Sequence, residues 1–126
     1  MENEIKDILS YLGMGMAVIL PIGIYGFLLI DKLIKRMYES FNAEWQKVGK
    51  PSGMFYFPPE GRSLQSMISM QLNIFVWFFK TPVWIKSDAV SLENLKRLRW
   101  SFAIANIAML ILFVVVFLMI KDLIQQ

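Results

Sequence analysis

The side chains most often used in catalysis and metal binding are scarce in this sequence. It contains no cysteine and no histidine, which excludes disulfides, thiolate chemistry, imidazole ligands and histidine acid–base catalysis. General acid–base catalysis needs carboxylates that converge in one site, whereas scattered carboxylates are more typical of helix caps and surface ion pairs. The carboxylates in the middle of the chain are scattered: Asp31, Glu39, Glu44, Glu60, Asp88 and Glu93. We therefore expect no enzyme activity, no cofactor and no metal.

A second chemical possibility is phosphate binding by the sequence Gly49-Lys50-Pro51-Ser52. The upstream glycine of a phosphate-binding loop is absent, and no strand precedes the sequence, so we reject this possibility. The glycines and prolines of residues 49–62 instead predict a loop over this segment. The loop also contains Phe55, Tyr56 and Phe57, which favour either the lipid headgroup region or a protein pocket.

Two apolar segments, residues 8–30 and 102–120, dominate the 126-residue chain. Neither contains a charged residue, and about 20 residues are needed to cross roughly 30 Å of hydrocarbon as a helix. We expect an all-α integral membrane protein whose two transmembrane helices form an antiparallel hairpin. A buried core helix is the alternative for either segment. The acidic start MENEIKD and the lack of an Ala-x-Ala-like site predict that 8–30 is a retained anchor, not a cleaved signal peptide.

The distribution of positive charge predicts the orientation. Of 13 lysines and arginines, 11 lie between residues 32 and 99, and basic residues near a span are retained in the cytoplasm. We expect a multi-pass protein of the bacterial inner membrane with a cytoplasmic middle and both tails, 1–7 and 121–126, outside. The same cations can attract anionic lipids, although setting the topology explains them sufficiently. Those flanking the spans are Lys32, Lys35, Arg36, Lys96, Arg97 and Arg99.

The two apolar segments contain residues suited to close helix packing. Pro21 frees the carbonyl of Ala17, a defect that membrane helices tolerate when a neighbouring helix covers it. Small residues let helix backbones approach closely, and an asparagine in lipid needs a hydrogen-bond partner such as the kink carbonyl or another subunit. The candidate packing residues are Gly13, Ala17, Pro21, Gly23, Gly26, Ser101, Ala105, Asn106 and Ala108. They suit packing of the two spans, of a second copy or of another membrane protein.

Residues 63–80 predict an amphipathic helix between the spans. At 100° per residue, one face is apolar and the other carries Gln65, Ser66, Ser69, Asn73 and Lys80. Gln71 is the one polar residue that does not follow this division. We expect the apolar side to meet either the membrane interface or a protein partner, with tryptophans as anchors. Strand structure in the apolar half is a third alternative. The apolar face comprises Leu64, Met67, Ile68, Leu72, Ile74, Phe75, Phe78 and Phe79, and the anchors are Trp77 and Trp84.

The remaining segments are predicted to connect these elements within a single domain. The first span should continue as a stem helix over 31–48, and Pro82 should make 81–87 a turn. A second stem helix over 88–101, capped by Asp88 or Ser91, should lead into the last span and pack on the first stem.

The arrangement resembles the universal stress protein B family of small bacterial inner-membrane proteins. The residues that carry the resemblance are Trp45, the sequence Gly49-Lys50-Pro51-Ser52 with aromatics after it, Asp88, and the stem sequence Leu92, Leu95-Lys96-Arg97-Leu98-Arg99. The segment 63–80 departs from the family pattern because it is more hydrophobic than expected. The resemblance implies a span at each end, a cytoplasmic middle and a link to stress physiology, with no established biochemical activity.

Three functions fit these patterns. The first is a non-catalytic accessory or adaptor subunit that docks on a larger inner-membrane complex or on a second copy. The second is a lipid-packing sensor that binds the membrane surface through the 63–80 helix, and the third is a small oligomeric pore. We expect membrane lipids and membrane proteins as partners, and no nucleic acid, because the excess positive charge lies beside the membrane boundary.

Overall fold

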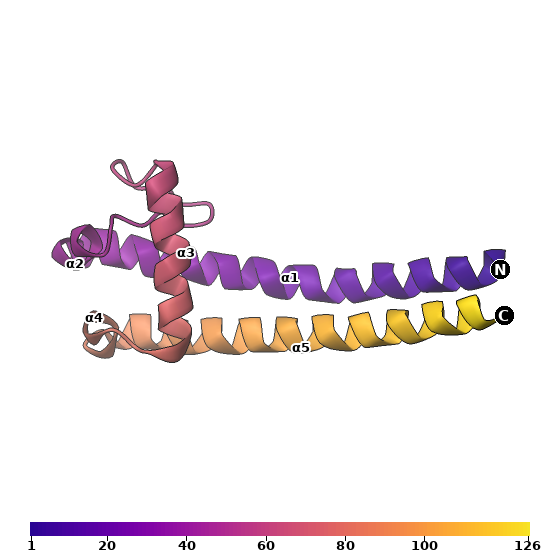
Figure 1. The fold of residues 1–126 in the computed structure, drawn as a ribbon. Coiled ribbons are helices and arrows are strands. Elements are labelled where there is room, and N and C mark those ends of the chain that lie inside the picture. Colours follow the sequence, from indigo (N-terminus) through magenta and orange to yellow (C-terminus); the bar gives the residue numbers. More distant parts are fainter. The chain divides into compact units, whose positions relative to one another are not determined.

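A computed structural model describes all residues, 1–126. The chain is all-helical, as predicted, with α1 (Glu2–Ser40), α2 (Asn42–Lys47), α3 (Leu64–Phe79), α4 (Val83–Lys86) and α5 (Ala89–Gln125) (Figure 1). Two helices, α1 and α5, are long and apolar enough to cross a membrane. Where the sequence suggests one domain, the contacts divide the chain into two compact units. Unit 1 is Met1–Ile24 with Ser101–Gln126, and unit 2 is Tyr25–Trp100.

Unit 1 consists of two paired helical segments. The Ser101 hydroxyl donates to the carbonyl of Ile22 at 2.9 Å, and the Gln126 amide donates to Glu4 at 2.7 Å. Because low residue numbers on one segment pair with high numbers on the other, the segments run antiparallel, with both chain ends at the same end of the unit (Figure 1). None of the most apolar stretch of α5 is buried by protein.

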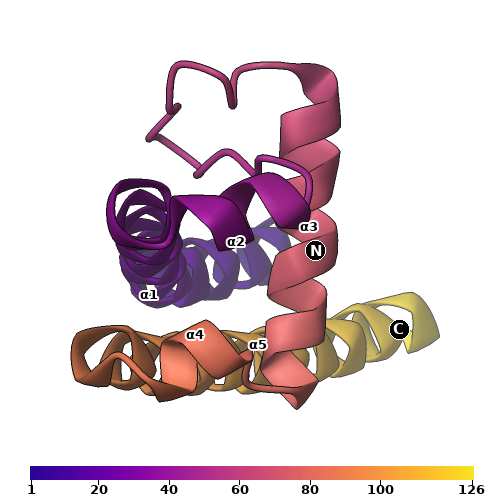
Figure 2. The same ribbon diagram turned by 90° about the vertical axis from the view of Figure 1, so that its left-hand side faces the viewer.

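Unit 2 has a buried core of its own. Eight large side chains from α1, α2, α4 and α5 are at most 1% exposed: Leu29, Leu33, Ile34, Met37, Trp45, Ile85, Leu95 and Leu98. Viewed along the stems, α3 passes alongside both the α1–α2 end and the α4–α5 end of the unit (Figure 2). The segment that had strand as an alternative is therefore helical.

The predicted stem helix 31–48 is interrupted. At Phe41 the backbone leaves the helical region, with φ −131° and ψ 47°, and α2 begins at the next residue. The interruption places the Phe41 ring 5.2 Å from the ring of Trp84, and the Asn42 amide donates to the Tyr38 carbonyl at 3.0 Å. A favourable aromatic contact and a capped carbonyl thus accompany the break in the helix.

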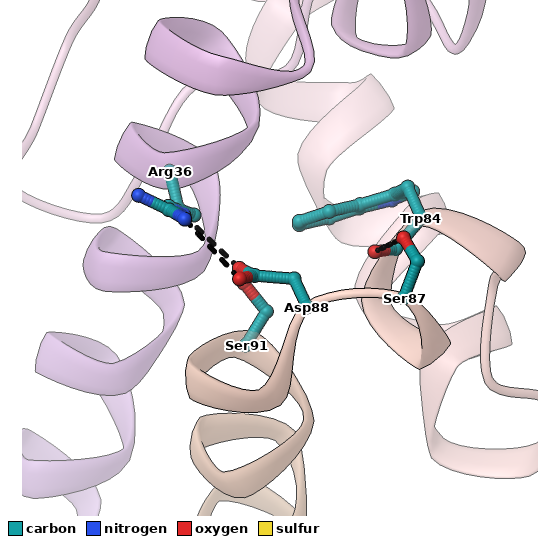
Figure 3. Close-up of polar contacts among 5 residues, drawn as sticks. All are labelled: Arg36, Trp84, Ser87, Asp88 and Ser91. Carbon is teal, nitrogen blue, oxygen red and sulfur yellow. Dashed lines mark hydrogen bonds and ion pairs between the residues drawn. The ribbon is translucent and has the colours of Figure 1, made fainter.

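The predicted turn 81–87 contains the short helix α4. Pro82 precedes it in an extended conformation, which proline favours, and the Ser87 hydroxyl donates to the carbonyl of Trp84 at 2.8 Å near its end (Figure 3). The helix turns Trp84 inward, where its side chain is only 6% exposed and lies 5.8 Å from the ring of Trp77. The prediction that Trp84 is an interfacial anchor is therefore wrong: it is a core residue of unit 2.

Candidate functional site

The buried face of α3 contains Ser66 and Ser69 beside Met70, Ile74 and Trp77, and Asn73 is half-buried at its edge. The Ser69 hydroxyl donates to the Val48 carbonyl at 2.6 Å, and the Asn73 amide donates to the same oxygen at 3.2 Å. Near the start of the helix, the Ser52 backbone N–H donates to the carbonyl of Ser66 at 3.2 Å. These bonds satisfy polar groups that would otherwise be costly to bury, so they fix which side of α3 faces the protein.

Arg99 fixes the other end of α3. Its guanidinium donates to the Trp77 carbonyl at 3.0 and 2.6 Å and to the Thr81 hydroxyl at 2.9 Å. A cation at a helix C-terminus satisfies free carbonyls and interacts favourably with the helix dipole. Arg99 is therefore more than the topology or lipid cation that the sequence suggests. Trp77, predicted as an interfacial anchor, is 3% exposed and belongs to the core instead.

The opposite face of α3 is apolar and uncovered. At 100° per residue, five large side chains fall within an arc of about 80°. Their exposed fractions run from 43% to 79%: Leu64, Ile68, Leu72, Phe75 and Phe79, which we call the outer face. The Phe75 and Phe79 rings contact each other at 5.4 Å between centroids. Of the other residues predicted on this side, Met67 is exposed, Phe78 is half-buried and Ile74 is buried against the protein.

Asp31 holds the aromatic loop that precedes α3. Its carboxylate accepts from the backbone N–H groups of Met54 at 2.6 Å and Phe55 at 3.1 Å. A Cβ at Gly53 would overlap the Asp31 carboxylate and would lie 2.8 Å from the Tyr56 carbonyl, so this position requires glycine. The Phe55 ring packs edge-on against Phe27, 6.3 Å between centroids, while its side chain remains 60% exposed.

Trp45 supports the same loop from inside. Its indole Nε1 donates to the Pro51 carbonyl at 2.9 Å, its ring packs against Tyr38 at 4.9 Å, and Gly61 lies against the ring. Gly49 and Lys50 both have positive φ, 99° and 53°, which reverses the chain immediately after α2. Gly49-Lys50-Pro51-Ser52 is thus a structural turn.

The predicted cations divide into paired and unpaired groups. Arg36 makes a bidentate pair with Asp88, at 3.0 and 3.2 Å, and the Ser91 hydroxyl donates to the same carboxylate at 2.6 Å (Figure 3). These hydrogen bonds lower the pKa of Asp88, which stands at the start of α5, and raise the pKa of Arg36. Arg97 pairs with Glu93 at 3.2 Å. Lys32, Lys35 and Lys96 make no ion pair.

The predicted packing residues lie on different sides of unit 1. Ala105 and Ala108 are half-buried, and the Ser101 hydroxyl bonds α1 as described. Gly13, Ala17 and Pro21 are exposed, and a Cβ at Gly13 or Gly23 would meet no atom within 4 Å. The two segments approach closely at Gly15, where an added Cβ would lie 2.6 Å from the Leu112 side chain.

Asn106 and Gly26 complete the predicted packing set. The Asn106 amide donates to the Phe102 carbonyl in its own helix at 2.7 Å, and not to the carbonyl of Ala17 that Pro21 leaves free. A bond to the preceding turn is available to any helical asparagine without tertiary contact. Gly26, which belongs to unit 2, is buried.

No protein-family model, curated protein or solved structure matches the chain. The resemblance to the universal stress protein B family therefore stays a prediction. Within the structure, no three acidic side chains lie close enough to hold a metal ion together. The most distinctive surface of unit 2 is the outer face of α3, because large apolar side chains are uncovered there while the polar side of the same helix is bonded inward.

Proposed function

We propose that the chain is a non-catalytic accessory protein of the bacterial inner membrane, and that the outer face of α3 docks on a larger membrane protein. In this proposal α1 and α5 cross the bilayer, both termini lie outside and unit 2 lies on the cytoplasmic side. The hydropathy and length of both helices support the spans, and the basic residues of 32–99 support the orientation. A link to stress physiology stays part of the proposal through the family resemblance.

The observation that carries the proposal is the uncovered apolar outer face of α3, on a helix whose inner side is already bonded to the protein. A helix that lies on a membrane by itself keeps a charged face toward water. The inner face of α3 is uncharged and bonded to Val48, whereas its outer face exposes Leu72, Phe75 and Phe79 by 63%, 66% and 79%. A large apolar patch on a folded surface is typical of an interaction site. Because the inner bonds hold the helix in place, it supports a rigid docking surface better than a sensor that leaves and rejoins the lipid.

The attachments of α3 support a partner that is itself in the membrane. The preceding loop is held by Asp31, the first residue after the apolar segment 8–30. The C-terminal end of α3 is held by Arg99, three residues before the segment 102–120. Both attachments therefore belong to residues that border the proposed spans, which favours a partner surface close to the bilayer.

Site-specific photo-crosslinking in native membranes tests the docking surface. A photoreactive phenylalanine analogue in place of Phe75 should give a discrete adduct with one larger membrane protein. The same analogue in place of Lys86, an exposed residue of α4, should give none. Adducts with lipid alone at position 75, or equal protein adducts at both positions, would contradict the proposal.

Paired substitutions sharpen this test. Leu72→Ser with Phe79→Ser should lower the adduct yield at position 75 roughly tenfold or more, because each buried leucine or phenylalanine contributes about 1.5–3 kcal/mol. Val83→Ser with Val90→Ser is the matched control, since these valines are also exposed, by 80% and 63%, but lie outside α3. An equal loss in both double variants would show that general surface hydrophobicity, and not the outer face, drives the association.

A further inference from the structure

A pocket of about 300 Å³ lies between α1 and the aromatic loop of unit 2. Its wall contains apolar residues of α1 beside two lysines and two tyrosines, and it does not include any residue of the outer face of α3. The lining residues are Tyr25, Leu28, Leu29, Asp31, Lys32, Lys35 and Tyr56. The pocket is thus a second feature of unit 2, independent of the docking surface.

The charges at this pocket favour an anion. Lys32 and Lys35 are exposed and make no ion pair. The one lining carboxylate, Asp31, already accepts backbone N–H groups from Met54 and Phe55.

Tyr56, which lines the pocket, is a neutral hydrogen-bond donor. Burial is the main cause that raises the pKa of the Tyr56 hydroxyl, with the charge of Glu39 as a further cause. The hydroxyl therefore remains protonated at neutral pH and can donate to a phosphate oxygen. Two unpaired cations and a hydroxyl donor are the groups that recognise a phosphate.

The apolar part of the pocket indicates that the phosphate belongs to a lipid. Leu28 and Leu29 lie in the last apolar turn of the segment 8–30, and Lys32 follows within one helical turn. A free phosphate has no apolar group that could contact the leucine side chains of the pocket, whereas a phospholipid presents its phosphate beside glycerol and acyl carbons. Cations immediately beside a span are also where anionic lipid headgroups are bound.

We propose that this pocket binds the headgroup of an anionic phospholipid, with Lys32 and Lys35 contacting the phosphate and the exposed Leu28 contacting the adjoining hydrocarbon. The inference rests on the proposed membrane insertion of α1, and it does not depend on the docking role of α3. It also selects two lysines from the six cations that border the proposed spans.

Native mass spectrometry of the full-length protein tests the site. The protein is released from neutral detergent micelles that contain equal parts phosphatidylglycerol and phosphatidylcholine. We expect the wild type to retain phosphatidylglycerol in preference to phosphatidylcholine. Lys32→Gln with Lys35→Gln should weaken phosphatidylglycerol binding about 25-fold, because each lysine beside an anionic headgroup contributes roughly fivefold.

The matched control removes the same charge from elsewhere in unit 2. Lys47→Gln with Lys86→Gln should change phosphatidylglycerol binding by less than about twofold, because exposed charges away from the site are screened. Neither lysine lines the pocket or makes an ion pair. Circular dichroism of both double variants checks that the helix content is unchanged.

Three results would overturn the proposal. The first is equal retention of both lipids by the wild type, and the second is equal losses in the two double variants, which would mean a diffuse charge effect. The third is displacement of the lipid by millimolar inorganic phosphate, which would mean that the site recognises phosphate without the lipid. None of these results affects the crosslink at position 75, whereas release of the protein from membranes by carbonate would overturn the insertion on which both proposals rest.

Discussion

The two units use apolar side chains in opposite ways. In unit 2, residues such as Leu33, Ile34 and Trp45 are at most 1% exposed, so the protein itself covers them. In unit 1, Leu110, Phe113 and many similar side chains are largely exposed, these two by 64% and 68%. Unit 2 therefore has an interior that the protein itself covers, whereas unit 1 buries only a few side chains, such as Ile19 at 7% exposed, and leaves most of its large apolar side chains uncovered.

This difference teaches where each unit's stability comes from. Burial of apolar surface by protein drives the folding of unit 2 and makes it sensitive to changes in shape. Between helices in lipid the hydrophobic driving force is absent, and association depends on close packing and a few hydrogen bonds. Within unit 2, the outer face of α3 gathers five large apolar side chains on one helix, most of them as exposed as the side chains of unit 1.

The largest expected effect comes from the core of unit 2. Trp45→Ala removes a ring that is 1% exposed and a hydrogen bond to Pro51, so it should lower the free energy of unfolding of unit 2 by roughly 3–5 kcal/mol. Phe113→Ala, at a side chain 68% exposed, should change stability by less than about 0.5 kcal/mol. Denaturant unfolding in mild detergent, followed by near-UV circular dichroism, measures both. Similar losses for the two variants would break the distinction between the units.

Two glycines give the next largest contrast. Gly53→Ala should destabilise unit 2 by about 1–3 kcal/mol, because its Cβ would overlap the Asp31 carboxylate and crowd the Tyr56 carbonyl. Gly23→Ala in unit 1 meets no atom within 4 Å and gains helix propensity, so it should be neutral or stabilising. The measurement is the thermal unfolding midpoint of each variant. A stable Gly53→Ala protein would show that the loop does not need Asp31 as its anchor.

Acid should weaken unit 2 through Asp88. The Arg36 and Ser91 hydrogen bonds lower the pKa of Asp88 below its ordinary value of 3.8, so the carboxylate stabilises the folded state above that pH. The stabilisation is lost as the pH falls through 3.8 toward the lower pKa of the folded protein. Between about pH 6 and pH 3, the unfolding midpoint of Asp88→Asn should therefore fall less than that of the wild type. If the unfolding midpoints of the two proteins fell equally with pH, this role of Asp88 would be contradicted.

The sequence predicts the helices better than it predicts which side of each is covered. Two apolar segments of about 20 residues and the period of 63–80 are strong local signals, and α1, α5 and α3 follow them. The same periodicity marks two faces of α3 but cannot say which one meets the protein. The buried side is decided by the Val48 carbonyl, which is 21 residues from Ser69 and accepts its bond.

The roles of several site residues could not be predicted from the sequence either, because these roles also depend on contacts with other segments of the chain. Asp31 reads as an ordinary boundary charge, and its bonds to Met54 and Phe55 depend on a loop that passes back beside α1. Trp77 and Trp84 follow the pattern of interfacial aromatics, yet they are 3% and 6% exposed, and the ring of Trp84 packs against Phe41, which is distant in sequence. Gly53 is the residue of this site whose type does indicate its role, since a glycine in a loop between prolines often marks a close approach of the backbone to another group.

The smallest effect tests the hydrogen bond within unit 1. Ser101→Ala removes the hydroxyl that donates to the Ile22 carbonyl at 2.9 Å. Hydrogen bonds between membrane helices contribute about 0.6 kcal/mol on average, because the separated helices find other partners, and Ile22 can keep its helical bond. Ser10→Ala, at an exposed serine of α1, is the matched control. Unfolding by sodium dodecyl sulfate in mixed micelles measures the difference. A loss as large as that for Gly53→Ala would mean that unit 1 also depends on a specific protein interior, and the contrast between the two units would then fail.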